Sequence, residues 1–179
     1  MANSLEELLM TEISRRNTDL VSDLILKKPE LFDNLMVIFL ENQEPVSRRA
    51  AWVADTCSEK EPGLLDPWIG KIIDSLPSFS HDGLKRHSLR MLSRSVLPAD
   101  RLGKLISLCF GWLTSPKESV AVKVFCMEIL YRVSQNEPDI RQELIDSIEW
   151  RMSEESPGFR TRGLKILSKL ARELRDLHS

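Results

Sequence analysis

The sequence predicts an all-α protein, and three features of its 179 residues support this fold class. Leucine occurs 27 times, whereas valine and threonine together occur 14 times. Leucine favours helices, and a shortage of β-branched residues disfavours sheets. Apolar residues recur at i, i+3, i+4 and i+7 along most of the chain, as one face of a helix requires. A helical pattern also returns every 37–38 residues, which predicts stacked helix pairs.

Ten helices joined by short linkers are predicted from this periodicity. They cover residues 4–15, 18–28, 30–42, 45–58, 63–76, 82–95, 98–114, 118–134, 138–153 and 158–176. The first helix carries a single apolar stripe, made of Leu5, Leu8, Leu9 and Ile13. One such stripe suits a terminal helix, which covers its neighbour while its own outer side stays polar.

Prolines and polar caps predict where several helices begin. Residues 115–118 read Ser-Pro-Lys-Glu, which has the form of a capping box with proline at the first helical position. Ser156 and Pro157 repeat this arrangement, and Pro45 stands at a similar place. Asn136 is a candidate cap just before the helix predicted at 138–153.

Four of the helices share one apolar face in register. Its positions are Val46, Ala50, Val53, Ala54 and Cys57, then Leu84, Ser88, Met91, Leu92 and Ser95, then Val122, Cys126, Ile129, Leu130 and Val133, then Phe159, Gly163, Ile166, Leu167 and Leu170. The second position of each set is small, so a neighbouring helix can approach closely there. A two-helix period of this length predicts an α-solenoid.

The second helix of each pair resembles that of HEAT repeats, which reads apolar, basic, then small, then leucine. The matching stretches are Leu84-Lys85…Ser88…Leu92, Val122-Lys123…Cys126…Leu130 and Phe159-Arg160…Gly163…Leu167, whereas Val46-Ser47…Ala50…Ala54 departs from the pattern. The resemblance covers residues 29–176. It implies a right-handed α-α superhelix of about four to five helix pairs, with the second helices on its concave surface.

A single domain over residues 1–179 is expected. Its repeats are about 29–58, 63–95, 98–134 and 138–176, and residues 1–28 form N-terminal capping helices. A dimer contact is the alternative role for these first two helices, and the oligomeric state is left open.

Composition excludes several classes of protein. The net charge is −2, with 42% hydrophobic and 29% charged residues, as in ordinary globular domains. No apolar run reaches the roughly 18 residues that a membrane span needs. The acidic start of the chain does not resemble a secretory signal, so a cytoplasmic protein is expected. Cys57, Cys109 and Cys126 are interpreted as buried thiols in a reduced cytoplasm.

Motifs of catalysis and metal binding are missing. The sequence has no G-x-S-x-G, no P-loop, no dinucleotide-binding glycine pattern and no H-E-x-x-H. His81, His87 and His178 lack the spacing of metal ligands. We therefore expect no catalytic residue, no metal and no cofactor.

Charge is divided unequally between the two helix classes. The four second helices sum to +9, and the rest of the chain carries −11. Register then predicts a charge ladder on one flank, made of Arg94, Arg132 and Lys169 at the position of Thr56, with helices about 8–10 Å apart. The next column holds Trp52, Arg90, Glu128 and Lys165. We expect the ladder cations to be exposed and without partners. A solvated face is the alternative, with Lys85, Lys123 and Arg160 paired to neighbouring acids.

Trp52 is predicted to point away from the core, next to Arg48, Arg49 and Asp55. An exposed tryptophan can anchor a protein partner or stack on a nucleobase. The alternative is that Trp52 packs on the preceding helix. The other tryptophans are expected in the core or half-buried, at Trp68, Trp112 and Trp150.

Two functions follow from these observations. The first is a non-catalytic repeat scaffold that binds a protein partner on its concave, second-helix face. The candidate residues for a partner or an anion are Arg48, Arg49, Trp52, Arg86, Arg90, Arg94, Arg132, Lys165 and Lys169. The alternative is a nucleic-acid-binding protein with a basic concave face. In one version it is an enzyme similar in kind to the alkylpurine DNA glycosylases, with Trp52 and Asp55 beside the bound base.

Overall fold

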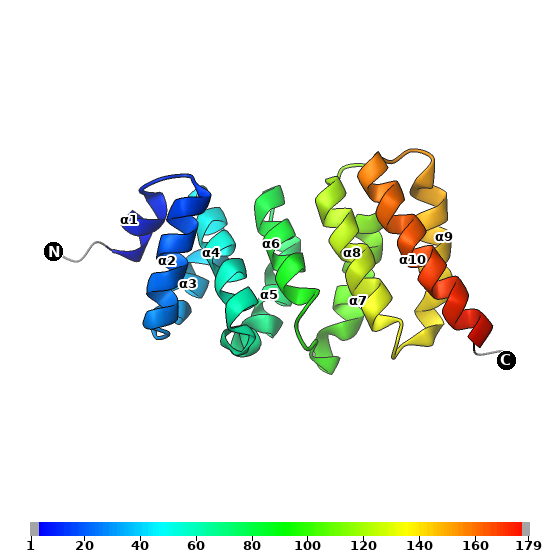
Figure 1. Ribbon diagram of the computed structural model, residues 1–179, viewed down its shortest axis with the longest axis horizontal. Coiled ribbons are helices and arrows are strands. Elements are labelled where there is room, and N and C mark those ends of the chain that lie inside the picture. The colour runs from blue at the N-terminus through cyan, green and yellow to red at the C-terminus, as the bar shows by residue number, and fades with distance from the viewer. Residues whose placement is uncertain (1–3, 177–179) are drawn as a thin grey trace. The chain divides into compact units, whose positions relative to one another are not determined.

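The computed structural model describes residues 4–176, which form α-helices and short 3-10 segments and contain no strand. The helices are α1 (Leu5–Met10), α2 (Arg15–Lys27), α3 (Leu31–Leu40), α4 (Val46–Lys60), α5 (Ile69–Ser75), α6 (Asp82–Leu92), α7 (Ala99–Thr114), α8 (Val120–Val133), α9 (Arg141–Met152) and α10 (Pro157–Asp176) (Figure 1). The all-α class predicted from the sequence is confirmed.

Packing divides the chain into two compact units, residues 1–101 and residues 102–179. The boundary falls in the first turn of α7, close to the start of the predicted repeat 98–134. Each unit is described by itself below, and the single domain expected over 1–179 stays a prediction.

In the first unit, α4 is the central helix. It packs against α2, α6 and α3, and the second helices α2, α4 and α6 lie side by side (Figure 1). The predicted core face of α4 is confirmed at Ala50 and Ala54, which are fully buried. Phe32 and Phe39 of α3 fill the space beneath. Burying one such side chain contributes about 1.5–3 kcal/mol.

In the second unit, α10 packs against both α8 and α9. Phe159, Ile166 and Leu170 form its buried face, as predicted. A Cβ atom at Gly163 would lie 2.9 Å from a methyl carbon of Ile148 on α9. The small residue expected at this position therefore allows the close approach of the neighbouring helix.

Two of the predicted helix starts are wrong and one is confirmed. Ser119, not the stretch 115–118, caps α8 by accepting a hydrogen bond from the Val122 amide. The 3-10 turn that begins at Pro138 has no side-chain cap, so Asn136 does not serve as one. Pro157 is the first residue of α10, as predicted.

Several predicted helices begin or end differently in the structure, and the one predicted at 82–95 ends at Leu92, so Arg94 lies in the turn after it. The first ends at Met10, so Ile13 lies outside it and is 71% exposed. The helix predicted at 63–76 starts as a 3-10 segment, Pro62–Trp68, and the helix predicted at 138–153 starts as Pro138–Ile140. Pro67, inside the first of these 3-10 segments, lacks an amide donor and therefore interrupts regular α-helical bonding there.

The cysteines are free and buried, as predicted. Burial raises the pKa of the Cys57 thiol. None of the helices in residues 4–176 has both the length and the apolar character needed to cross a membrane.

Candidate partner-binding surfaces

Asp55 of α4 lies at the centre of a buried polar network, although the sequence predicted that it would face away from the core. Its side chain is 0% exposed. Three side chains reach it, two from α6 and one from the turn that follows α6: His87 Nδ1 lies 2.8 Å from Oδ2, Arg90 Nη1 lies 2.8 Å from Oδ2, and Arg94 Nη2 lies 2.6 Å from Oδ1. The prediction failed because α6 packs beside α4, so a residue that points away from α3 can still be buried.

The network fixes the charge of Asp55. Burial by itself would raise the pKa of this carboxyl, but hydrogen bonds from His87 and Arg94 hold the pKa below its usual value. Arg94 also donates to the Asp55 carbonyl oxygen at 2.9 Å and to Ser58 Oγ at 3.0 Å. The expectation that Arg94 has no partner is therefore wrong.

Arg90 is partnered as well. It joins Asp55 to the exposed Glu59, with Nη2 lying 3.2 Å from Glu59 Oε1. Arg90 and Arg94, which the sequence marked as anion-binding, thus connect α6 and the turn after it to carboxylates of α4. Their charge is largely answered within the first unit.

Trp52 is half-buried, so the exposure predicted for it is only partial. Its indole stacks on His87 with ring centroids 6.2 Å apart and an interplanar angle of 19°. It therefore packs on the following second helix, α6. It also lines a shallow hollow together with Ile13, Asn17 and Arg49.

The basic residues around Trp52 are held to different degrees. Arg49 donates to the Leu9 carbonyl oxygen at 3.2 Å, while its buried Nε atom lacks a hydrogen-bond partner in the described residues. Arg48 Nε lies 3.3 Å from a Glu44 carboxylate oxygen. Arg86 of α6 is exposed. Ile13, Arg49 and Trp52 line the same hollow, and we call these three residues the Trp52 surface, of which Arg48 and Arg86 stay predicted members.

A second buried ion cluster holds the second unit together. Lys123 of α8 is 3% exposed and pairs with Glu155, which also accepts hydrogen bonds from Arg151 at 2.7 Å. Burial would raise the pKa of Glu155, but Lys123 and Arg151 hold it below its usual value. The alternative that Lys123 pairs with an acid is confirmed.

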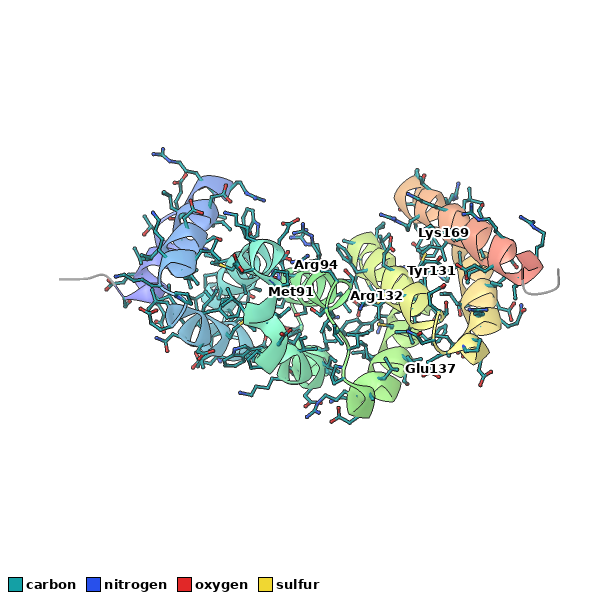
Figure 2. All side chains as sticks on the ribbon, turned by 60° about the horizontal axis from the view of Figure 1, so that its bottom comes forward. Met91, Arg94, Tyr131, Arg132, Glu137 and Lys169 are labelled. Atoms are coloured by element: carbon teal, nitrogen blue, oxygen red, sulfur yellow. The ribbon has the colours of Figure 1, made fainter. Side chains whose placement is uncertain are left out.

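A row of four cations runs along α10, at Arg162, Lys165, Lys169 and Arg172. Arg162 pairs with Glu128 of α8 at 2.5 Å. Lys169 Nζ lies 4.9 Å from the centroid of the Tyr131 ring, and both residues are labelled in Figure 2. Within the described residues, Lys165 and Arg172 are exposed and make no hydrogen bond or ion pair. We call these four residues the α10 row.

The predicted charge ladder divides between the two units. Arg94 belongs to the first unit, whereas Arg132 and Lys169 belong to the second. A continuous ladder across the chain therefore stays a prediction. Arg132 is half-buried on α8, next to Tyr131 in the sequence.

The other tryptophans follow the prediction in two of three cases. Trp68 is buried and donates its indole N–H to Asp33 at 3.0 Å, and Trp112 is half-buried. Trp150 is 66% exposed on α9, so that prediction is wrong. The periodicity of α9 could have shown this, because Trp150 lies two residues from the buried Ile148 and hence on the other side of the helix.

No metal centre is visible in residues 4–176, where no group of three or more His, Cys, Asp or Glu side chains could hold an ion. The two candidate binding surfaces in the described part of the chain are therefore the Trp52 surface and the α10 row.

These features define an all-α repeat protein with helix pairs stacked within each unit and strongly charged second helices. The sequence profile described as "HEAT repeat domain" matches residues 5–170, so the chain belongs to the HEAT repeat family. No curated protein and no solved structure matches the sequence. The similarity to DNA glycosylases is not shown by these comparisons.

Proposed function

We propose that the protein is a non-catalytic scaffold that binds a protein partner on the exposed side of its second helices. HEAT repeats generally mediate protein interactions. The observation that carries the proposal is the Trp52 surface, where a half-exposed indole lies beside the 71% exposed Ile13 and basic side chains. Tryptophan and arginine are the residues most enriched at the energetic centres of protein interfaces.

The state of Asp55 supports binding over catalysis at this surface. A carboxylate that assists base excision must face its substrate, but Asp55 is 0% exposed and its two oxygens already accept from His87, Arg90 and Arg94. Arg90 and Arg94 are likewise occupied. The network therefore serves to join α4 to α6 and to hold the ring beneath Trp52.

The remaining candidate residues stay part of the proposed surfaces. Arg48, Arg49, Trp52 and Arg86 belong to the first unit, and Arg132, Lys165 and Lys169 to the second. The buried free thiols suit a reducing compartment, so we place the scaffold in the cytoplasm.

The proposal is tested by affinity capture with matched tryptophan variants. Immobilised wild-type protein, Trp52→Ala and Trp150→Ala are incubated with an extract of the source cells, and bound proteins are quantified by mass spectrometry. Trp150 is the control because it is exposed on α9, a first helix. The best-enriched protein is then purified and titrated. We expect at least a tenfold loss of affinity for Trp52→Ala, equal to about 1.4 kcal/mol, and no loss for Trp150→Ala.

A second variant guards against a folding effect of the first. Ile13 lies outside the helices, so Ile13→Asp should weaken the same partner while melting like the wild type. Loss of the partner in Trp150→Ala alone would move binding to the first helices and contradict the proposal. Partners retained equally by all variants would contradict it as well.

A further inference from the structure

The surface between α8 and α10 is hollowed near the start of α10, where the two helices lie side by side (Figure 1). The hollow has a volume of about 520 Å³ and is lined by Val124, Pro157, Gly158, Thr161, Arg162 and Lys165. Val120 is 37% exposed and adjoins it, since a Cβ atom at Gly158 would lie 3.7 Å from Val120 Cγ1. Val120, Val124 and Pro157 give this end of the α8–α10 groove an apolar floor.

The rim of the groove is cationic. The spacing of the α10 row, from 162 to 165, 169 and 172, places its four side chains on one side of the helix. The row spans ten residues, or about 15 Å. Farther along, the Tyr131 ring lies under Lys169 (Figure 2) and continues the floor.

The carboxylates facing the row are fewer than its cations. Glu128 is taken up by Arg162, and Glu173 accepts from the Tyr131 hydroxyl at 2.6 Å. Lys165 and Arg172 are left without a carboxylate partner among residues 4–175, the part of the chain whose side chains the structure describes. The groove thus combines an apolar floor with unanswered positive charge along one edge.

We propose that the α8–α10 groove binds an amphipathic helix of a partner protein whose apolar side carries a flanking row of Asp or Glu. This inference rests on the proposed scaffold function and specifies the partner's chemistry. A helix of about three turns matches the length of the α10 row. Its apolar side chains at i, i+3, i+4 and i+7 cover Val120, Val124 and Tyr131, and its carboxylates meet Lys165 and Arg172.

A peptide helix fits this groove better than a nucleic acid does. A phosphate backbone gains nothing from the valines of the floor. Its regularly spaced charges also meet Glu128 and Glu173, which lie among the cations. A protein helix, in contrast, can place its carboxylates only where the cations are. The chain's net charge of −2 further disfavours a polyphosphate partner.

The test measures binding of defined probes to the full-length protein by fluorescence anisotropy. The first probe is a capped helical peptide of about 14 residues, or ~21 Å, with Leu at i, i+3, i+4 and i+7 and Glu along one flank. The second has every Glu replaced by Lys, and the third is a single-stranded DNA of similar length. We expect binding of the acidic peptide that weakens with salt, weaker binding of DNA and none of the basic peptide.

Variants locate the binding. Lys165→Glu with Arg172→Glu should weaken the acidic peptide at least tenfold. The control pair Arg16→Glu with Lys28→Glu changes two exposed cations of the first unit by the same total charge and should leave the affinity unchanged. Val124→Ser should weaken the peptide but not DNA, because only the peptide uses the apolar floor. Melting curves should show that all variants fold.

Several results would overturn the inference. One is failure of the wild-type protein to bind the acidic peptide, and another is equal loss in the groove and control pairs. Tighter binding of DNA that Val124→Ser does not change would assign the groove to polyphosphates instead. Concentration-dependent self-association that the groove pair abolishes would make the occupant a second copy. Each result leaves the Trp52 surface unaffected, so failure here is distinguishable from failure of the proposed function.

Discussion

At the scale of single residues, the surroundings of each cationic side chain determine whether it stabilises the fold or stays available for binding. Arg94 and Lys165 lie at neighbouring register positions of the predicted second helices. Arg94 nevertheless donates to buried Asp55, whereas Lys165 extends from α10 without an ion pair in the described residues. A helical wheel of α4 places Asp55 on the side opposite α3, but it cannot show that α6 packs beside α4 and covers this residue. Residue identity therefore could not separate the two roles, because the distinction comes from the packing of α6 on α4.

Acid should destabilise the protein partly through Asp55. Its pKa is lower in the folded protein than in the unfolded chain, where it is about 3.9. The carboxylate therefore stabilises the fold fully above about pH 4, and this stabilisation is lost as pH falls through the folded-state pKa. Glu155, whose pKa is also lowered, acts in the same direction.

The pH effect is measured by urea unfolding of the wild type and Asp55→Asn between about pH 3 and pH 7. We expect the free energy of unfolding to fall more steeply below about pH 4 in the wild type than in the variant, because the variant lacks one of the protons taken up on unfolding. Parallel curves for the two proteins would show that Asp55 has the same pKa folded and unfolded.

At the scale of helices, the repeat pattern predicted the buried positions more accurately than the capping motifs predicted where helices begin. Ala50, Ser88, Cys126 and Gly163 are buried where the register required small residues. These positions are set by helix packing, which repeats every 37–38 residues. Helix starts depend instead on one local hydrogen bond, and neighbouring serines compete for it.

Two glycines offer a matched test of helix packing. A Cβ atom at Gly163 would lie 2.9 Å from Ile148 Cγ2, whereas one at Gly111 of α7 would meet nothing within 4 Å. Gly111→Ala should stabilise the protein by up to about 1 kcal/mol through helix propensity. Gly163→Ala should destabilise it by about 1 kcal/mol, because overpacking exceeds that gain. Chemical denaturation measures both, and stabilisation by both substitutions would refute the close approach of α9.

At the scale of the whole chain, some cations of the second helices form ion pairs that stabilise the fold, and others are exposed and proposed to bind a partner. The second helices hold a net +9, as the sequence shows. In the structure, several of these cations pair with acids inside the two units: Asp55, which is already counted in that sum, and Glu59 and Glu155, which are not. The α10 row keeps the largest unanswered share among the described second helices. The sequence could locate the cations but not their partners, since Asp55, Glu59 and Glu155 lie 31–39 residues away in the chain from the second-helix cations that they pair with.

The central claim is that Arg90 and Arg94 hold the fold while Lys165 and Arg172 of α10 bind a partner, and two serine variants test it most directly. Thermal unfolding and acidic-peptide affinity are measured for Arg94→Ser and Lys165→Ser. Arg94→Ser should lose about 2 kcal/mol, lowering the melting temperature by about 4–8 °C, with unchanged affinity. Lys165→Ser should melt as the wild type does and bind the peptide several-fold more weakly. A normal melting temperature with weakened binding in Arg94→Ser would contradict the account, because Arg94 would then be a free binding cation.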